Sequence, residues 1–557
     1  MKITAASLTV IACLLGAVDG ARILGVFPLH VKSHYNVYEP LLKRLSARGH
    51  EIVAVTHFPQ RIRLANFTDV DISSSLPSMV GTRPFNDIQN YTIWQNIRNL
   101  PYRHGVEICE PVLKHPEVKR IIETRQRFDL LVIEIFATDC FLSFAHALSI
   151  PRVVGAISSV TLPWSNEILR NPENPSYIPN WFSPYTGRMS FLERSINTAG
   201  LLITKLAYRI FSDGPSYEIA RKYFGDDLPD FDVLRSRISL ILTNGHPAVS
   251  VARPLAPGFK EIGGIHIPIS GPQPVAVDLQ DYLDSHGENG VIYFSLGSLM
   301  DPSTMPKQVF AALYRAFEQV PQQILWKCAE RSMPSPLPRN VKCVEWMPQL
   351  SALCHPNTRL FITHGGMLGI QEAVYCGVPI LGMPLYGDQH LNMAYLVEKG
   401  LALRLNFQDF SYEQLRSNLN ELLTNKSYTE MAQKASFEFK DRPMPPLEKA
   451  VYWVEHTLRH DANFLKMGAT ELTWYQYLLL DVALDDCSYV WQVSAAERCE
   501  WVKSTEDCFS DSVIQYTVLL FCFFKSEDVA LFACGLLLML LWLLYLFLIL
   551  ATTAGNL

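Results

Sequence analysis

The sequence predicts an α/β protein with two domains of similar size, each a parallel sheet covered by helices. Short apolar segments typical of buried strands alternate with segments of helical length and pattern. The alternation stops once, at a stretch rich in Pro and Gly, and then restarts. A strand-helix-strand order favours parallel strands, because the chain must cross back over the sheet between them. At 557 residues the chain is also long enough for two or three domains.

The first alternation predicts a domain over residues 21–270. RILGVF at 22–27 has the composition of a strand, and the residues after it place apolar side chains on one helical face until Gly49, which is suited to end a helix. EIVAVT follows as the next strand, and FDLLVIEIF and SLILTN repeat the pattern further along the chain.

The second alternation predicts a domain over residues 271–460. It follows the Pro and Gly cluster at 268–274, which we interpret as a linker. GVIYFSLGS starts it, and QILWKC, RLFITHGG and VPILGMP continue it. The domain is expected to end in a helix, because PPLEKAVYWVEHTLRH begins with Pro and has an apolar helical face.

The two ends of the chain predict a single-pass membrane protein. Residues 1–20 combine one Lys, an apolar run and small residues, which is the pattern of a cleavable signal peptide. Residues 529–550 form an uncharged apolar run that is long enough to cross a lipid bilayer of roughly 30 Å. We therefore expect type I topology, with the large domains outside the cytosol and residues 551–557 as a cytosolic tail.

Residues 461–528 form a membrane-proximal segment that we interpret as containing an insertion. The tetrapeptide DVAL occurs at 481–484 and again at 528–531. Removing residues 485–531 would join YQYLLLDVAL directly to the C-terminal apolar run as one helix. The removed residues are therefore predicted to be dispensable.

Composition and spacing exclude several classes of function. The 48 Lys and Arg against 54 Asp and Glu leave no basic surplus for a nucleic-acid partner. The 12 Cys include no CxxC pair, which argues against a zinc ribbon or a redox motif and leaves disulfide pairing open. The Asp-x-Asp triplets at 69–71 and 230–232 lie in the first domain, away from the loops that could bind a nucleotide, so no metal is expected.

The stretch from Arg359 to Asn392, which contains HGGMLGIQEAVYCGVPILGMPLYGDQ, has the features of a phosphate site. A predicted strand ends at Thr363, and a helix is expected from about Met367, after a Gly-Gly turn. Such a helix start presents unpaired backbone N–H groups and favours a phosphate. His364 can add a directed hydrogen bond, and Glu372 can bind the vicinal hydroxyl groups of a ribose.

Neighbouring loops offer partners for the rest of a nucleotide sugar. In WMPQ, Trp346 offers a flat face for a base and the amide of Gln349 can read its edge. Asp388 and Gln389, one loop later, can hold sugar hydroxyl groups. The alternative, a strand-turn-helix without a ligand, is common in α/β proteins, but it does not account for the added partners of base and sugar. The motifs together predict a nucleotide-sugar site.

On these motifs the chain closely resembles the UDP-glycosyltransferase family, the membrane-bound enzymes of the secretory pathway, and looks most like its insect members. The resemblance covers about residues 21–481 and is carried by the run from Trp346 to Gln389. It implies the GT-B fold, in which two Rossmann-like domains face a cleft, with the acceptor site in the first and the UDP-sugar site in the second. It also implies a lumenal enzyme of the endoplasmic reticulum membrane.

The family pattern implies roles for the residues of the second domain. Trp346 stacks on uracil, Gln349 contacts the base or ribose, and Glu372 binds the ribose. His364 and the amides after it hold the diphosphate. The remaining residues that the pattern assigns to the donor site are Ser295, Gly297, Ser298, Gly366, Met367, Leu368, Asp388 and Gln389. Leu368 departs from vertebrate relatives, which have a polar residue there, so the phosphate grip should rest more on the backbone and His364.

The catalytic base is expected on the loop after the first strand, PLHVKSHYNVYEP, which offers His30 and His34. His34 occupies the family's Ser-His position and is our choice, whereas His30 is expected to have no catalytic role. TDCFLSF resembles the family's Asp-containing segment, so we expect Asp139 to orient His34, with Glu134 as the alternative. A neutral imidazole can take the proton of an acceptor hydroxyl at lumenal pH.

The predicted function is transfer of a hexose from a UDP-sugar to a hydroxyl group of a small lipophilic acceptor, with inversion and without a metal. The insect resemblance favours UDP-glucose over UDP-glucuronate, and the UDP-sugar is a co-substrate, so no other cofactor is expected. The alternative is a catalytically silent membrane protein that binds lipophilic ligands, because the aromatic segment at 163–191 would suit either. The His34 and Asp139 pair favours the enzyme. The acceptor and homo-oligomerisation are left open.

Overall fold

The computed structural model describes residues 20–482, apart from 88–92, 286, 334–335, 408–409 and 461. Several expectations lie outside the described residues: the signal peptide up to residue 19, the interpreted insertion at 485–531, the membrane span at 529–550 and the tail at 551–557. The chain divides into a compact unit up to Thr470 and a second unit from Glu471, and the sheets below belong to the first unit. Within the described ranges, no helix has both the length and the apolar composition to cross a membrane.

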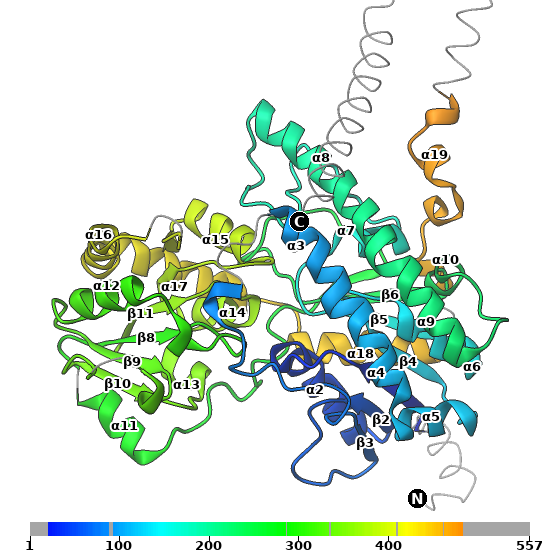
Figure 1. Cartoon of the computed structure of the whole chain (residues 1–557), viewed down its shortest axis with the longest axis horizontal. Coiled ribbons are helices and arrows are strands. Elements are labelled where there is room, and N and C mark those ends of the chain that lie inside the picture. The colour runs from blue at the N-terminus through cyan, green and yellow to red at the C-terminus, as the bar shows by residue number, and fades with distance from the viewer. Residues whose placement is uncertain are drawn as a thin grey trace, which may run out of the picture. The chain divides into compact units, whose positions relative to one another are not determined.

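The N-terminal half of the first unit contains a parallel sheet with the strand order β3-β2-β1-β4-β5-β6-β7 (Figure 1). Its strands are β1 (Arg22–Phe27), β2 (Glu51–Thr56), β3 (Phe67–Asp71), β4 (Leu130–Glu134), β5 (Val153–Ile157), β6 (Ile238–Thr243) and β7 (Phe259–Glu261). The predicted strands RILGVF, EIVAVT and SLILTN are confirmed. The central strands are buried along almost their whole length, as expected for a parallel sheet covered on both faces.

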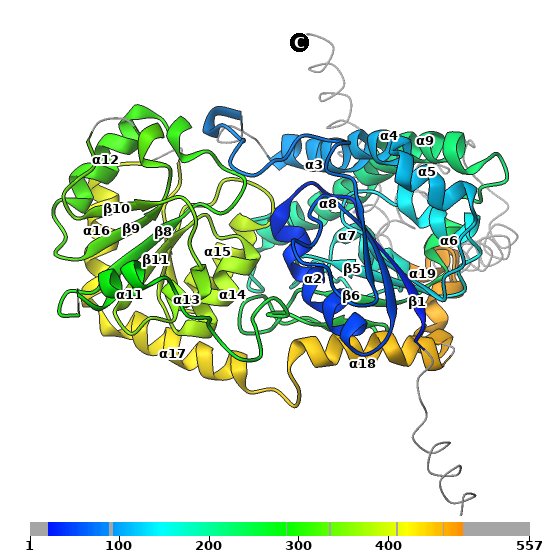
Figure 2. The same ribbon diagram turned by 90° about the horizontal axis from the view of Figure 1, so that it is seen from below.

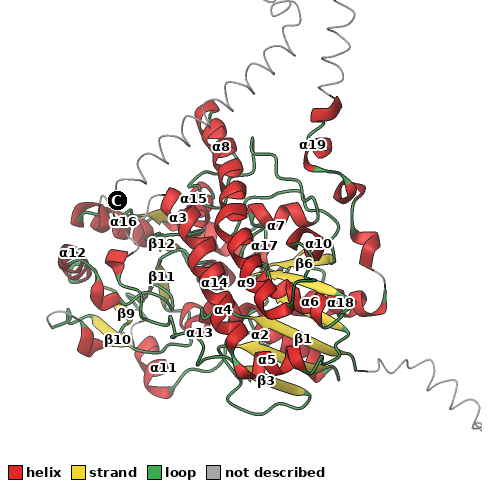
Figure 3. Cartoon of the chain, turned by 45° about the vertical axis from the view of Figure 1, so that its right-hand side comes forward, coloured by secondary structure: helices red, strands yellow, loops and turns green. Residues whose placement is uncertain are grey.

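Helices flank this sheet on both sides (Figure 3). They are α2 (Lys32–Ala47), α3 (Ile93–Pro101), α4 (Glu107–Lys114), α5 (Pro116–Glu123), α6 (Ser143–Ala147), α7 (Pro163–Ile168), α8 (Phe191–Tyr208), α9 (Gly214–Phe224) and α10 (Phe231–Arg235). The predicted helix after β1 is α2, and Tyr38, Leu41 and Leu45 on its apolar face are fully buried. It ends before Gly49, whose φ of 97° suits Gly far better than any other residue.

The C-terminal half contains a second parallel sheet with the order β10-β9-β8-β11-β12-β13. Its strands are β8 (Val291–Ser295), β9 (Gln323–Lys327), β10 (Val341–Val344), β11 (Thr358–Thr363), β12 (Ile380–Gly382) and β13 (Ala402–Arg404). The helices around it are α11 (Val277–Asp284), α12 (Lys307–Phe317), α13 (Gln349–Leu353), α14 (Met367–Cys376), α15 (Gln389–Glu398), α16 (Tyr412–Thr424) and α17 (Lys426–Lys440). Two α/β halves, each with a parallel sheet, are therefore confirmed.

The helix α18 (Pro446–Arg459) runs back to the N-terminal half, beneath α2 (Figure 2). Its buried residues Val451 and Val454 join the core formed by α2 and the first sheet. Glu455 accepts hydrogen bonds from Arg48 at 2.5 and 2.9 Å. The apolar pattern of residues 445–460 predicts this helix as the end of the second domain, whereas its buried side chains pack on the first.

A segment of the N-terminal half, residues 81–85, packs on the C-terminal half. Gly81 and Arg83 donate backbone hydrogen bonds to Ser298 and Leu299 in the loop after β8. Phe85 is fully buried in the core of the C-terminal half, with its ring centre 5.2 Å from that of Phe407. The two halves are thus joined by packing in both directions as well as by the linker.

We expect Phe85→Ala to lower the stability of the protein against urea by about 3–5 kcal/mol, because it removes a fully buried ring and leaves a cavity. Ile62→Ala, at a side chain that is 77% exposed, is the control and should change stability by about 0.5 kcal/mol or less. Equal effects of the two substitutions would show that Phe85 is not anchored in the second core.

Candidate active site

A cavity of about 440 Å³ lies where the carboxyl ends of strands from both sheets meet. This edge is the expected ligand site of an open parallel sheet. Every residue that the sequence analysis assigned to the site lines this cavity, with the exception of Asp139. These residues are His34, Ser295, Gly297, Ser298, Trp346, Gln349, His364, Gly366, Met367, Leu368, Glu372, Asp388 and Gln389.

His34, in the first turn of α2, is paired with Glu134. Its Nδ1 lies 2.6 Å from Glu134 Oε1, and Glu134 is the last residue of β4 and is 4% exposed. Ser158 Oγ, just after β5, lies 2.9 Å from the same Nδ1. The Phe136 ring packs edge-on against the imidazole at 4.6 Å. The ring is therefore held in one orientation by three groups at the ends of two neighbouring strands, β4 and β5.

The expected pairing of Asp139 with His34 is corrected by these contacts. Asp139 Oδ2 accepts hydrogen bonds from Arg235 Nε at 2.8 Å, from Arg235 Nη2 at 2.6 Å and from the Tyr208 hydroxyl at 3.0 Å. Asp139 is 3% exposed and Arg235 is 7% exposed. Glu134 ends a strand and so reaches the sheet edge, whereas Asp139 comes five residues later and has turned towards the outer helices. Glu134, the alternative in the sequence analysis, is the carboxylate beside His34.

His30 does not line the cavity. Burial and the positive charge of Arg83 lower the pKa of His30 to about 4, so its imidazole is neutral at neutral pH. Its ring packs edge-on against that of His57, with ring centres 5.7 Å apart. Of the two histidines of this loop, His34 is the one that lines the cavity.

His364 is enclosed by two glycines. A Cβ atom at Gly297, whose φ is +85°, would lie 2.6 Å from the imidazole, and one at Gly366 would lie 2.5 Å from Nε2. Only glycine therefore allows the ring to fit between the loop after β8 and the start of α14. Burial, together with the positive charge of Lys327, lowers the pKa of His364 to about 4. The ring is neutral at neutral pH and can donate one N–H.

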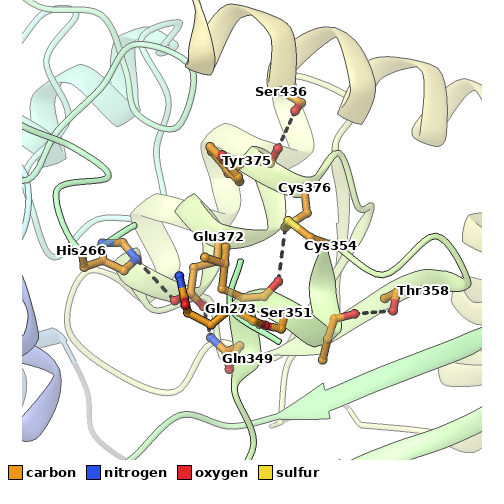
Figure 4. The surroundings of a disulfide bond; sticks show 12 residues. His266, Gln273, Gln349, Ser351, Cys354, Thr358, Glu372, Tyr375, Cys376 and Ser436 are labelled. Atoms are coloured by element: carbon orange, nitrogen blue, oxygen red, sulfur yellow. Dashed lines mark hydrogen bonds and ion pairs between the residues drawn. A yellow bond between two sulfur atoms is a disulfide. The ribbon is translucent and has the colours of Figure 1, made fainter. Parts of the chain in front are cut away.

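Gln349 and Glu372, which both line the cavity, form a hydrogen-bonded pair (Figure 4). Gln349 Nε2 donates to Glu372 Oε2 at 2.5 Å, and the Tyr293 hydroxyl donates to Gln349 Oε1 at 3.3 Å. His266, from the stretch before the linker, places Nε2 3.5 Å from Glu372 Oε1. Trp346 precedes this pair, and its ring is 74% exposed, so its face is accessible to a planar ligand.

Asp388 and Gln389 lie at the start of α15 and differ in their hydrogen-bond partners. Burial raises the pKa of Asp388 to about 6, although Asn392 Nδ2 donates to its carboxylate at 3.0 Å. Gln389 Oε1 accepts from the backbone N–H groups of Leu385 and Tyr386 at 2.8 and 3.2 Å. Gln389 therefore braces the loop with its carbonyl oxygen and has only its amide N–H groups left for a ligand.

The structure adds residues that the sequence analysis missed. Lys327, at the end of β9, donates from Nζ to Gly297 O at 3.1 Å and lies 5.6 Å from the centre of the Trp346 ring. On the other side of the cavity, His104, Phe136 and Trp181 contribute to the wall. Lys327 was identifiable in principle, because it ends a predicted strand of the nucleotide domain. His104 has no such signal, since it lies far from the predicted strand ends.

Among the described residues no group of three or more His, Cys, Asp or Glu is arranged to hold a metal ion. The Asp-x-Asp triplets do not line the cavity. Asp232, of the second triplet, is engaged by Arg209 at 2.8 Å and by Arg235 at 2.7 Å.

The chain matches a known protein family and resembles characterised relatives along most of its length. Residues 23–510 match the model of the family described as UDP-glucoronosyl and UDP-glucosyl transferase. A similar protein is UDP-glucosyltransferase 2 of Dactylopius coccus, which is 37% identical over 85% of this chain and 91% of its own. UDP-glucuronosyltransferase 2B17 of Mus musculus is 30% identical over 86% of this chain and 92% of its own.

Solved structures support the fold. A UDP-glucose:anthocyanidin 3-O-glucosyltransferase in complex with UDP superimposes with a TM-score of 0.53 over 79% of this chain and 100% of its own, at 18% identity. Spinosyn forosaminyltransferase SpnP gives a TM-score of 0.53 over the same shares. The two parallel sheets of this chain therefore have a GT-B-like glycosyltransferase arrangement.

We expect Asp139→Asn to act on stability. Leaving the buried Arg235 guanidinium short of one carboxylate should lower the free energy of unfolding by up to about 3–5 kcal/mol, with Asp213 and Asp232 offsetting part of the loss. Asp232→Asn, which removes a 64% exposed partner of the same Arg235, is the matched control and should cost about 1 kcal/mol or less. Chemical denaturation measures both. If Asp139→Asn left the stability unchanged but abolished turnover, Asp139 would have a role in catalysis.

Proposed function

The chain belongs to the UDP-glucoronosyl and UDP-glucosyl transferase family, and we propose that it transfers glucose from UDP-glucose to a hydroxyl group of a small lipophilic acceptor. It is therefore a UDP-glycosyltransferase. One observation carries the proposal: His34 of the first half, which is paired with Glu134, and the HGG helix start of the second half line the same cavity. Glucose as the sugar is supported by the name of the relative from Dactylopius coccus.

In this mechanism His34 is the general base. Nδ1–H donates to the Glu134 carboxylate, which leaves the lone pair of Nε2 for the proton of the acceptor hydroxyl. The acceptor oxygen forms a bond to the anomeric carbon as the bond from that carbon to the UDP oxygen breaks on the opposite face. The configuration is therefore inverted. The negative charge of Glu134 stabilises the imidazolium ion that forms.

The second half holds the donor. Trp346 stacks on the uracil, and the Gln349–Glu372 pair binds the base edge and the ribose hydroxyl groups. The neutral His364 and the free N–H groups at the start of α14 bind the diphosphate. They also stabilise the charge that develops on UDP as it leaves.

Asp388 and the Gln389 amide N–H groups bind the hydroxyl groups of the sugar. A carboxylate is the better acceptor for such groups, so sugar binding by Asp388 is stronger above its pKa of about 6. The wall opposite the donor is apolar and aromatic, with Leu100, Phe136 and Trp181. This composition supports a lipophilic acceptor whose hydroxyl group points towards His34.

We also propose that the enzyme works in the lumen of the endoplasmic reticulum, anchored by residues 529–550. Disulfides persist in oxidising compartments and are rare in the cytosol. The described residues contain three: Cys109–Cys140, Cys328–Cys343 and Cys354–Cys376. A silent binding protein is the less favoured function, because it would need neither a buried carboxylate beside His34 nor an accessible imidazole.

Removing the base should separate chemistry from binding. His34→Ala should lower turnover by about 10²- to 10⁴-fold while the affinity for UDP, bound by the other half, stays the same. Glu134→Gln should also lower turnover, because the charge that stabilises the imidazolium is lost. Steady-state kinetics with a phenol and with an aliphatic alcohol measures this, and His30→Ala is the control. Full turnover of the alcohol by His34→Ala would remove the assignment.

Removing a donor contact should weaken UDP directly. Trp346→Ala and Glu372→Ala should each reduce the binding free energy of UDP by about 1–3 kcal/mol, through loss of stacking and of a charged hydrogen bond. Trp474→Ala, a matched change of a 64% exposed Trp that does not line the cavity, should have no effect. Titration calorimetry compares the three variants, and unchanged affinity in the first two would place the nucleotide elsewhere.

A further inference from the structure

We propose that the disulfides Cys328–Cys343 and Cys354–Cys376 position the segment that binds the uracil base. This base segment consists of residues 344–353. The inference rests on the proposed function, because it assumes that Trp346 and Gln349 meet the base of UDP. It concerns four cysteines for which the sequence offered no pairing.

The two disulfides hold the base segment at both of its ends. Cys343 directly precedes it and is bonded to Cys328, the residue after β9. Cys354 directly follows it and is bonded to Cys376, the last residue of α14. The base segment is therefore covalently tied to the end of β9, the neighbour of the edge strand, on one side and to the phosphate-binding helix on the other.

The N-terminal end of the base segment needs such an anchor. It leaves β10, which is an edge strand with β9 as its one neighbour in the sheet. The ladder continues only to the bond from Cys328 N to Val344 O at 3.0 Å. Trp346, two residues later, is 74% exposed and has little packing that could fix its ring. Its position depends on the backbone that carries it.

Lys327 lies beside this first anchor. It immediately precedes Cys328, donates to Gly297 O at 3.1 Å, and lies 5.6 Å from the centre of the Trp346 ring. The Cys328–Cys343 bond therefore holds the end of β9, which carries the Lys327 cation, in register with the end of β10, two residues before Trp346. The Trp face that a base would use is set by this register.

The C-terminal end of the base segment is α13, a helix of five residues. So short a helix is not stable alone and takes its position from its neighbours. Figure 4 shows the bond between Cys354 and Cys376 joining α13 to α14 beside the Gln349–Glu372 contact. Glu372 lies about one helical turn before Cys376, so the disulfide fixes the separation that the 2.5 Å hydrogen bond requires.

A fixed base segment raises affinity by avoiding the loss of conformational freedom that binding would otherwise cause. The effect should be specific to the base, since the diphosphate groups bind to α14 and His364. Loosening the base segment should therefore reduce the preference for UDP over a diphosphate with another base. A disulfide that only stabilised the fold would not change that preference.

The test compares Cys328→Ala/Cys343→Ala, Cys354→Ala/Cys376→Ala and the fourfold variant in full-length enzyme, by calorimetry with UDP and with ADP. Each pair should weaken UDP binding by about three- to tenfold and leave ADP binding unchanged. Cys109→Ala/Cys140→Ala, which removes the disulfide of the other half, is the matched control and should leave both affinities unchanged. An unchanged UDP-to-ADP preference in the fourfold variant would overturn the proposal.

A second comparison separates positioning from stability. In a Trp346→Ala/Gln349→Ala background, removal of the disulfides should have no further effect on UDP binding, because the groups they position are gone. An equal further loss in that background would also overturn the proposal. If the wild-type enzyme did not bind UDP at all, the proposed function would fail instead.

If the Cys→Ala variants do not fold, the same test is made on the wild-type enzyme by graded reduction of its disulfides with dithiothreitol. Two thiols of the reagent supply two electrons and two protons to each Sγ–Sγ bond, which opens to two thiols while the reagent closes to a cyclic disulfide. Peptide mapping gives the opened fraction of each bond. Loss of UDP affinity should follow the opening of Cys328–Cys343 or Cys354–Cys376, and loss that follows only Cys109–Cys140 would contradict the proposal.

Discussion

Parallel strand direction is the constraint on which the site depends. In both sheets each strand runs parallel to its neighbours, so all carboxyl ends lie at one edge. Glu134 ends β4, Ser295 ends β8 and Lys327 ends β9. His34 lies one short loop beyond β1, and His364 directly follows β11. Side chains that are hundreds of residues apart in sequence thus reach one cavity without any long loop.

The edges face each other because the two halves are fastened together. Gln371 on α14 is fully buried, accepts from Gly264 N at 2.9 Å and donates to Asn244 O at 2.8 Å. A buried amide that satisfies two backbone groups of the other half is costly to displace, since each group would be left unpaired. Phe85 and α18 add apolar packing in both directions. The cavity therefore has fixed walls on both sides.

Local sequence patterns predict the site residues that lie in one strand-turn-helix motif. They do not predict which carboxylate pairs with His34, because that depends on contacts between residues far apart in the sequence. The HGG turn, Glu372 and Trp346 follow from strand-turn-helix order and chemistry within one domain, and all line the cavity. The motif predicts Asp139, a loop residue, as the partner of His34, and this is wrong because Glu134, at the end of β4, takes that position. Asp139 instead forms an ion pair with Arg235, 96 residues away in the sequence, and no local pattern indicates that pairing.

The packing of α14 against the first half explains why Leu368 departs from the family pattern. From the sequence alone, Leu368 is expected to be a lost polar contact to phosphate. In the structure Leu368 lies in the first turn of α14, beside the cavity, and packs against the core that contains Tyr35 and Phe27 of the first half. Gln371, three residues later and on the same face, makes the buried amide bridge. One face of α14 therefore holds the halves together, while its free N–H groups and Glu372 serve the donor. An apolar residue at 368 fits the first task, and the phosphate is left to the backbone and His364.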